Sequence, residues 1–158
     1  MKKNVFIAIV SVLVIILIVV SFYMLNVHIP YYDYHNHLDH IRNNICEKEN
    51  YEYKDYFFEY RGHDVLYVMK INVNDQDAYV VYDEDEEYVD SYQGKIADEK
   101  AVIKDIKKRY KVNVEHLDIA YDHSQFIYYA KYQDEDELIY FYYDLQTGEF
   151  IRAVQLGD

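Results

Sequence analysis

An uninterrupted apolar stretch near the N-terminus constrains this chain more than any other feature. From Val5 to Leu25 there is no charged residue, no Gly and no Pro, and sixteen of the 21 residues are Val, Ile, Leu or Phe. A helix of this length, rising about 1.5 Å per residue, crosses the roughly 30 Å hydrocarbon layer of a bilayer. Burial of the sixteen side chains favours insertion by at most about 5–10 kcal/mol. The sequence therefore predicts a transmembrane helix through residues 5–25.

The flanking residues predict its orientation. Lys2 and Lys3 precede the stretch, and no other Lys or Arg occurs before Arg42. The positive-inside bias places the N-terminus in the cytoplasm and the remainder of the chain outside the cell membrane. The stretch exceeds the apolar core of a signal peptide, about 7–15 residues, and bulky residues follow it. We therefore expect a retained single-pass anchor over residues 1–30, with a cleaved signal as the alternative and with Pro30 ending the helix.

The part that follows the anchor is acidic. Residues 31–158 hold all 29 Asp and Glu and 14 of the 16 Lys and Arg, which gives a net charge of 14 − 29 = −15. Nucleic-acid binding requires the opposite sign, so this class of partner is excluded. The acidity is typical of a solvated surface; the alternatives are attraction to a cationic partner or repulsion from an anionic wall polymer. The lone Cys46 leaves no internal disulfide.

Hydrophobic periodicity predicts two helices, each followed by four strands. In the helix expected over 32–49, one stripe runs from Tyr31 to Ile45 in steps of three and four residues. A second helix is expected over 98–110, with Asp98 as its cap. Gly148 is expected to supply the positive φ of the last turn. The predicted strands are 53–61, 65–73, 78–82 and 88–92 in the first half, and 114–121, 125–132, 138–143 and 149–154 in the second.

The two halves also resemble each other. Residues 68–83 match residues 128–144 at a shift of 61, which brings Lys70 onto Lys131 and Tyr79 onto Tyr140. A helix covering one face of an antiparallel sheet is an α+β unit. We therefore predict an α+β fold: an N-terminal transmembrane helix followed by two duplicated helix-on-antiparallel-sheet domains, residues 31–94 and 95–158.

In its predicted anchor, its internal repeat and the segment Y-Y-D-L-Q-T-G-E-F-I, the chain resembles the TseB (YpmB) family of membrane-anchored regulators of cell-wall elongation in Gram-positive bacteria. The segment I-A-D-E-K-A-V-I-K-D-I and the D-x-x-T-G-x-F hairpin are similar to PepSY-type and cystatin-like modules. One departure is Ala97, where PepSY-type sequences usually carry a capping Ser. The resemblance implies a penicillin-binding protein or another cell-wall synthesis protein as partner, and no catalysis. The alternative function is a PepSY-like inhibitor of a secreted peptidase.

No catalytic signature occurs in the sequence. It lacks a G-x-S-x-G elbow, a Gly-rich phosphate loop and an H-E-x-x-H pair, so we expect no enzyme and no cofactor. A metal hypothesis attaches to the histidines His35, His37 and His40: on a helix, Asp33, His37 and His40 share one face, whereas His35 points elsewhere. The alternative is a polar helix face. Cys46 is expected to be a half-buried structural residue, with a thiol nucleophile as the alternative. The acidic runs 83–87 and 134–137 are expected to be solvated turns, with loose binding of Ca²⁺ as the alternative.

The tyrosines are the candidate contact residues. In the strand 138–143, Leu138, Tyr140 and Tyr142 lie on one face and Ile139, Phe141 and Tyr143 on the other. One helix covers only one of these faces, so the other must meet the first domain or a partner. Interfaces favour Tyr. Tyr128, Tyr140 and Tyr142 are therefore the predicted partner surface, with packing between the two domains as the alternative.

Overall fold

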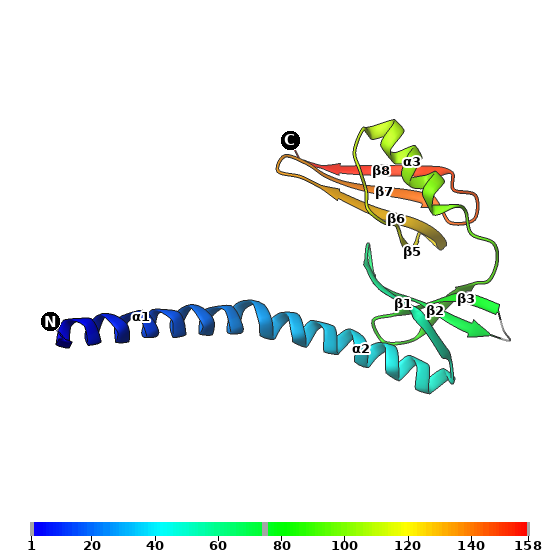
Figure 1. Ribbon diagram of the computed structural model, residues 1–158. Coiled ribbons are helices and arrows are strands. Elements are labelled where there is room, and N and C mark those ends of the chain that lie inside the picture. Colours follow the sequence, from blue (N-terminus) through cyan, green and yellow to red (C-terminus); the bar gives the residue numbers. More distant parts are fainter. Residues whose placement is uncertain (1, 74–75, 158) are drawn as a thin grey trace. The chain divides into compact units, whose positions relative to one another are not determined.

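The computed structural model describes residues 2–73 and 76–157, with the side chains of 10 and of 12 onward in the first helix. The chain divides into two compact units, residues 1–44 and 45–158. Both sheets belong to the second unit, which confirms a mixed α+β fold (Figure 1). The predicted domain boundary between residues 94 and 95 falls in the connection that follows the first sheet, and it stays a prediction.

The N-terminal unit is helical. α1 (Lys2–Tyr23) passes through a short π-helical turn, η1 (Met24–His28), into α2 (Ile29–Glu49). The apolar side chains from Val12 to Val20 are each about half exposed or more. Among the described residues, one helix near the N-terminus is long and apolar enough to cross a membrane. This agrees with a single anchor, while its orientation stays a prediction.

The expectation that Pro30 ends the helix is wrong. Pro30 is the second residue of α2, and the helix before it widens so that the Ile29 N–H donates to the carbonyl of Met24. A proline inside a regular α-helix lacks a donor and its ring clashes with the carbonyl four residues earlier. The π turn therefore lets the chain continue as helix through Pro30.

The first sheet contains β1 (Glu52–Arg61), β2 (Val65–Val73), β3 (Gln76–Asp83) and β4 (Tyr88–Tyr92), all antiparallel and in that order. The predicted strands agree closely, except that β3 begins two residues early at Gln76. Residues 74–75 of the predicted turn lie outside the described residues. Ile45, in the last part of α2, is fully buried, and Cys46 Sγ lies 3.7 Å from Met69 Sδ on β2.

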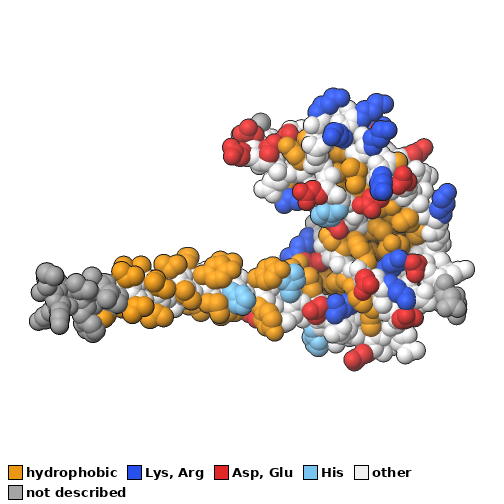
Figure 2. Space-filling view, in the orientation of Figure 1, with side chains coloured by type: hydrophobic (Ala, Val, Ile, Leu, Met, Phe, Trp, Pro, Cys, Tyr) orange, Lys and Arg blue, Asp and Glu red, His pale blue; other side chains and the backbone are white. Residues whose placement is uncertain are grey.

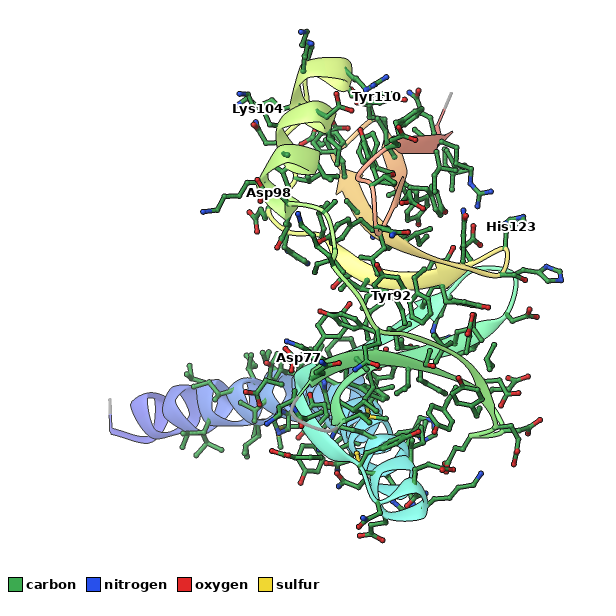
Figure 3. The ribbon with its side chains drawn as sticks, turned by 90° about the vertical axis from the view of Figure 1, so that its right-hand side faces the viewer. Asp77, Tyr92, Asp98, Lys104, Tyr110 and His123 are labelled. Carbon is green, nitrogen blue, oxygen red and sulfur yellow. The ribbon has the colours of Figure 1, made fainter. Side chains whose placement is uncertain are left out.

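The second sheet follows α3 (Glu99–Tyr110) and contains β5 (Asp118–Asp122), β6 (Gln125–Gln133), β7 (Leu138–Asp144) and β8 (Phe150–Leu156) in that order. As expected, Asp98 caps α3 by accepting a hydrogen bond from the Lys100 N–H (Figure 3). The strand predicted from Val114 begins only at Asp118. Val112, Val114 and Leu117 are buried as an irregular connection, because apolar residues there fill the core without a strand partner.

One core cluster of the described residues joins both sheets. Val102 and Ile106 of α3 pack over Phe141 on β7, and the same cluster includes Val68 and Val81 of the first sheet. A bulge in β1 falls between Tyr53 and Phe57, where Asp55 has a φ of 30°. Bulges redirect side chains. Here the hydroxyl of Tyr56 reaches Ile119 on β5, accepting from its N–H at 2.6 Å and donating to its carbonyl at 3.0 Å. Tyr56 therefore links the two sheets.

Candidate functional site

The structure places the three predicted contact tyrosines in different surroundings. Tyr128 on β6 is 3% exposed, belongs to the core under α3, and donates its hydroxyl proton to the carbonyl of Ala97 at 2.8 Å. Tyr142 on β7 is 9% exposed, and Tyr140 is half-buried. Tyr128 is therefore unavailable to a partner, because its strand position faces the helix. Of the three, Tyr140 is the side chain that solvent reaches best.

Tyr140 and Tyr142 lie on the face of the second sheet opposite α3. Tyr129 on β6 stacks on Tyr140 with ring centroids 5.8 Å apart and meets Tyr142 edge-on at 5.7 Å. Tyr129 also contacts Phe58 and Tyr60 of β1, with centroids 6.0 and 5.4 Å apart. Packing of β1 on this face thus buries Tyr142, which is the interdomain alternative considered above. Aromatic pairs of this kind add about 0.5–1.5 kcal/mol each.

Part of this face stays open. Directly opposite residues of antiparallel strands share a face, and the register of β7 with β8 pairs Tyr140 with Val154 and Leu138 with Leu156. Val154 is 37% exposed and Leu156 52%. We call Leu138, Tyr140, Val154 and Leu156 the open face. Val154 and Leu156 were not among the predicted contact residues, although the alternation in F-I-R-A-V-Q-L contains the signal.

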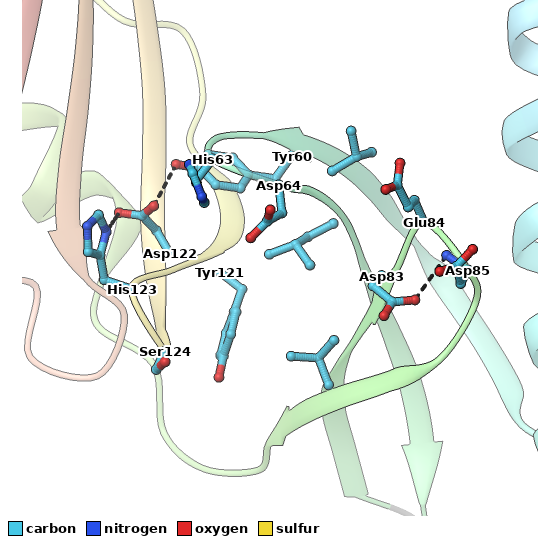
Figure 4. Close-up of a pocket in the computed structure, with 13 residues that line it drawn as sticks. Tyr60, His63, Asp64, Asp83, Glu84, Asp85, Tyr121, Asp122, His123 and Ser124 are labelled. Atoms are coloured by element: carbon cyan, nitrogen blue, oxygen red, sulfur yellow. Dashed lines mark hydrogen bonds and ion pairs between the residues drawn. The ribbon is translucent and has the colours of Figure 1, made fainter.

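A cleft of about 530 Å³ lies on the second unit between residues of both sheets (Figure 4). Tyr60, Leu66 and Val89 of the first sheet and Tyr121 of the second supply apolar surface. The remaining lining is mostly polar and acidic: His63, Asp64, Asp83, Glu84, Asp85, Asp122, His123 and Ser124. The lining of the cleft therefore combines apolar surface with several acidic side chains.

Asp122 joins the two sheets at one side of this cleft. Its carboxylate accepts hydrogen bonds from the Tyr60 hydroxyl at 3.2 Å and from Arg152 Nη2 at 2.7 Å, and lies 2.8 Å from His123 Nδ1. The Arg152 guanidinium also lies over the Tyr142 ring, 4.3 Å from its centroid. Asp122 is therefore held by neighbours and serves the joint between the sheets.

The tyrosine hydroxyls near the cleft remain protonated at neutral pH. Burial raises the pKa of Tyr60 far above its usual range, and the neighbouring Tyr142 and Asp122 raise it further. Burial also raises the pKa of Tyr121 to about 12, and its hydroxyl donates to Asp90 at 2.9 Å. These groups are hydrogen-bond donors that fix the sheets, since a phenol with such a pKa does not exchange protons near neutral pH.

The remaining candidate residues are the histidines of α2 and the two acidic turns, of which the turn 83–87 contributes Asp83, Glu84 and Asp85 to the cleft. Within the described residues, no group of three or more His, Cys, Asp or Glu is placed to hold a metal ion, and metal binding by the histidines of α2 stays a hypothesis. The His35 ring instead meets the Tyr31 ring edge-on, with centroids 4.2 Å apart. Each acidic turn is stabilised by hydrogen bonds within the turn. Asp83 Oδ1 accepts from the N–H groups of Asp85 and Glu87, and Asp134 Oδ1 accepts from those of Asp136 and Glu137.

Comparison of the chain with protein-family models, with curated proteins and with solved structures gave no match. Any functional conclusion therefore rests on the residues themselves and on the arrangement described above.

Proposed function

We propose that this protein is a single-pass, N-in membrane protein whose domains, held outside the membrane, bind a cell-wall synthesis enzyme and regulate cell elongation without catalysis. One observation carries the proposal: a helix with exposed apolar side chains from Val12 to Val20 belongs to the same chain as an acidic unit that has an open apolar face. A tethered protein that presents such a face is suited to binding another protein at the membrane surface.

We further propose that the two sheets are copies of one unit. Both final hairpins carry a one-residue bulge at equivalent positions: Val89 lies between the pairs Val81–Asp90 and Tyr82–Tyr88, and Ile151 between Tyr142–Arg152 and Tyr143–Phe150. Bulges at matching positions are features that related sequences retain. Chance alternation of apolar residues would produce strands in both halves, but it would not place a bulge at the same position in both sheets.

The turns before these bulges support the same proposal. Asp83 and Asp144 occupy equivalent positions; Asp83 accepts from the N–H groups of Asp85 and Glu87, and Asp144 accepts from the N–H of Thr147 in its own turn. Glu86 and Gly148, which also correspond, both have positive φ, 58° and 72°. A duplicated helix-plus-sheet unit is what the PepSY-type and cystatin-like resemblance implies.

The identity of the partner follows only from the resemblance to the TseB family, which implies a penicillin-binding protein. The test is a photoreactive amino acid at Tyr140 in the full-length chain, crosslinked in cells and read by mass spectrometry. Tyr88, a 53% exposed tyrosine on β4, is the matched control position. We expect capture of a penicillin-binding protein from Tyr140 and little from Tyr88.

Two results contradict the proposal. Capture of a secreted peptidase, together with loss of its activity when the full-length protein is added, would establish the PepSY-like inhibitor instead. Crosslinks from Tyr140 that reach only the first sheet of the same chain would mean that the open face is internal packing.

A further inference from the structure

The four sheet edges of this protein differ in how well they are protected. An exposed edge presents unpaired N–H and C=O groups, which invite another strand unless charges, bulges or coverage prevent it. Along β1, the bulge near Asp55 interrupts the edge, and ion pairs Lys54–Glu52 and Arg61–Glu59 lie on it. β4 is only five residues long and contains the bulge at Val89. These two edges are poor templates for a further strand.

The β5 edge is covered by the protein itself. The N–H and carbonyl of Ile119 are both hydrogen-bonded to the Tyr56 hydroxyl of β1. The carboxylate of Asp122, at the end of the same strand, bonds Tyr60 and Arg152. A strand approaching β5 would have to displace these bonds.

The edge of β8 is different because only the first part of this strand is protected. The bulge at Ile151 interrupts the first part, and Arg152 is engaged with Asp122. The remaining segment, Ala153–Leu156, contains no charge, no Gly and no Pro, and pairs only with β7 among the described residues. Its side chains Val154 and Leu156 are 37% and 52% exposed and form the outer part of the open face.

An acidic turn lies at the C-terminal end of this segment. The turn 134–137 connects β6 to β7, and Gln155 Nε2 donates to Glu137 Oε2 at 2.9 Å. A Cβ at Gly157 would lie 2.8 Å from the Asp136 carbonyl oxygen, which shows how closely the turn adjoins the strand end. Asp134 is occupied by the turn's own N–H groups and by Tyr132. Figure 2 shows acidic side chains gathered at this end of the second sheet.

We propose that residues 152–156 of β8 accept an extended segment of a partner protein as a fifth, antiparallel strand of the second sheet. Main-chain hydrogen bonds would supply the affinity, and every second side chain of the segment would lie against Val154, Leu156 and Tyr140. An antiparallel segment begins beside the turn 134–137, so basic residues are favoured at its N-terminal end and apolar residues alternate after it.

The net charge of the chain favours a partner segment with a basic end over a second copy of the chain. Residues 31–158 carry a net charge of 14 − 29 = −15, so two copies repel each other, whereas a segment with a basic end is attracted. Lys104 of α3 points away from the second sheet (Figure 3), and Arg109, which lies over the Phe150 ring 5.1 Å from its centroid, is paired with Asp105. The inference deepens the proposed protein-binding function and rests on it for its biological meaning, but the edge can be tested without any knowledge of the partner.

The experiment uses the full-length chain in nanodiscs of phosphatidylcholine. The probe is a fluorescent octapeptide, Lys-Arg-Val-Thr-Val-Thr-Val-Thr, and binding is followed by fluorescence anisotropy, with hydrogen exchange of the bound protein. We expect saturable binding and slower exchange of backbone amides within residues 152–156. The variant Val154→Lys should weaken binding about tenfold or more, since it adds a charge to the edge and repels the basic peptide.

Three controls sharpen the result. Val89→Lys on β4 alters an apolar side chain of similar exposure, 40% against 37%, and should change the affinity by less than about twofold. A peptide with its basic pair at the C-terminal end should bind about two- to tenfold more weakly, as expected for loss of one or two exposed ion pairs. A peptide N-methylated at alternate amides should lose binding, because its side chains are retained and its ladder donors are not.

The inference is overturned if the peptide does not bind, if exchange slows on β4 instead of β8, or if the full-length chain forms a dimer that Val154→Lys abolishes. If the peptide does not bind but Tyr140 captures a penicillin-binding protein, the proposed function stands and only the inference about the β8 edge is refuted. Peptide binding at β8 without any such capture supports the edge and refutes the proposed partner.

Discussion

Removal of one oxygen atom should show how firmly the two sheets are joined. In Tyr56→Phe the ring remains, but Ile119 loses both partners of its backbone: the hydroxyl that accepts from its N–H at 2.6 Å and donates to its carbonyl at 3.0 Å. The Ile119 side chain is 6% exposed, and packing of β1 beside β5 restricts access of water. A buried polar group left without a partner costs about 1–3 kcal/mol. Two such groups predict a loss of about 2–6 kcal/mol.

The assay is urea unfolding of the full-length chain in detergent, followed by near-ultraviolet circular dichroism of the tyrosines. Tyr140→Phe is the matched control, because this half-buried tyrosine donates no hydrogen bond in the described structure, and its loss should change the free energy of unfolding by less than about 0.5 kcal/mol. Native-state hydrogen exchange should also accelerate at the Ile119 amide more than at Ala120. A Tyr56→Phe variant as stable as the control would refute the link between the sheets.

Three further predictions concern the second helix and sheet. Burial raises the pKa of the Asp118 carboxyl because it disfavours the charged form, while His116 lowers this pKa and Glu99 raises it further. The charged carboxylate therefore destabilises the fold. This penalty is absent at low pH and grows as the pH rises from the unfolded-state pKa of 3.8 to the higher folded-state pKa. Asp118→Asn should accordingly gain stability relative to the natural chain as pH rises through that window, and a constant difference in unfolding free energy across pH would contradict this. Asp98→Ala removes the cap of α3 and should cost about 0.5–2 kcal/mol in urea unfolding, whereas Lys104→Ala on the same helix should be near neutral. Gly148→Ala places a Cβ at a φ of 72° and 3.0 Å from the Cβ of Ala97, and should cost about 1–2 kcal/mol in thermal unfolding; an unchanged midpoint would mean that the turn relaxes freely.

The sequence alone determined the features that depend on neighbours along the chain. The apolar stretch, the alternation that predicts β2, and the acid at Asp98 each specify local structure, because side-chain spacing and capping act within one or two turns. Gly148 was predictable for the same reason: its turn requires a positive φ. The strand alternation of β7 likewise predicted which tyrosines share a face.

Only the tertiary structure decided what those elements meet. Pro30 continues a helix because a wider turn precedes it, and Val114 joins the core without joining a strand. Tyr128 is buried because α3 covers its face of the second sheet, whereas the burial of Tyr142 and the exposure of Val154 and Leu156 depend on how β1 packs on the opposite face. Such contacts join residues about sixty positions apart, as Tyr56 and Ile119 do, and no local pattern contains them. The edge of β8 stays open for the same reason: whether an edge strand is covered depends on the positions of all the other strands, which only the tertiary structure gives.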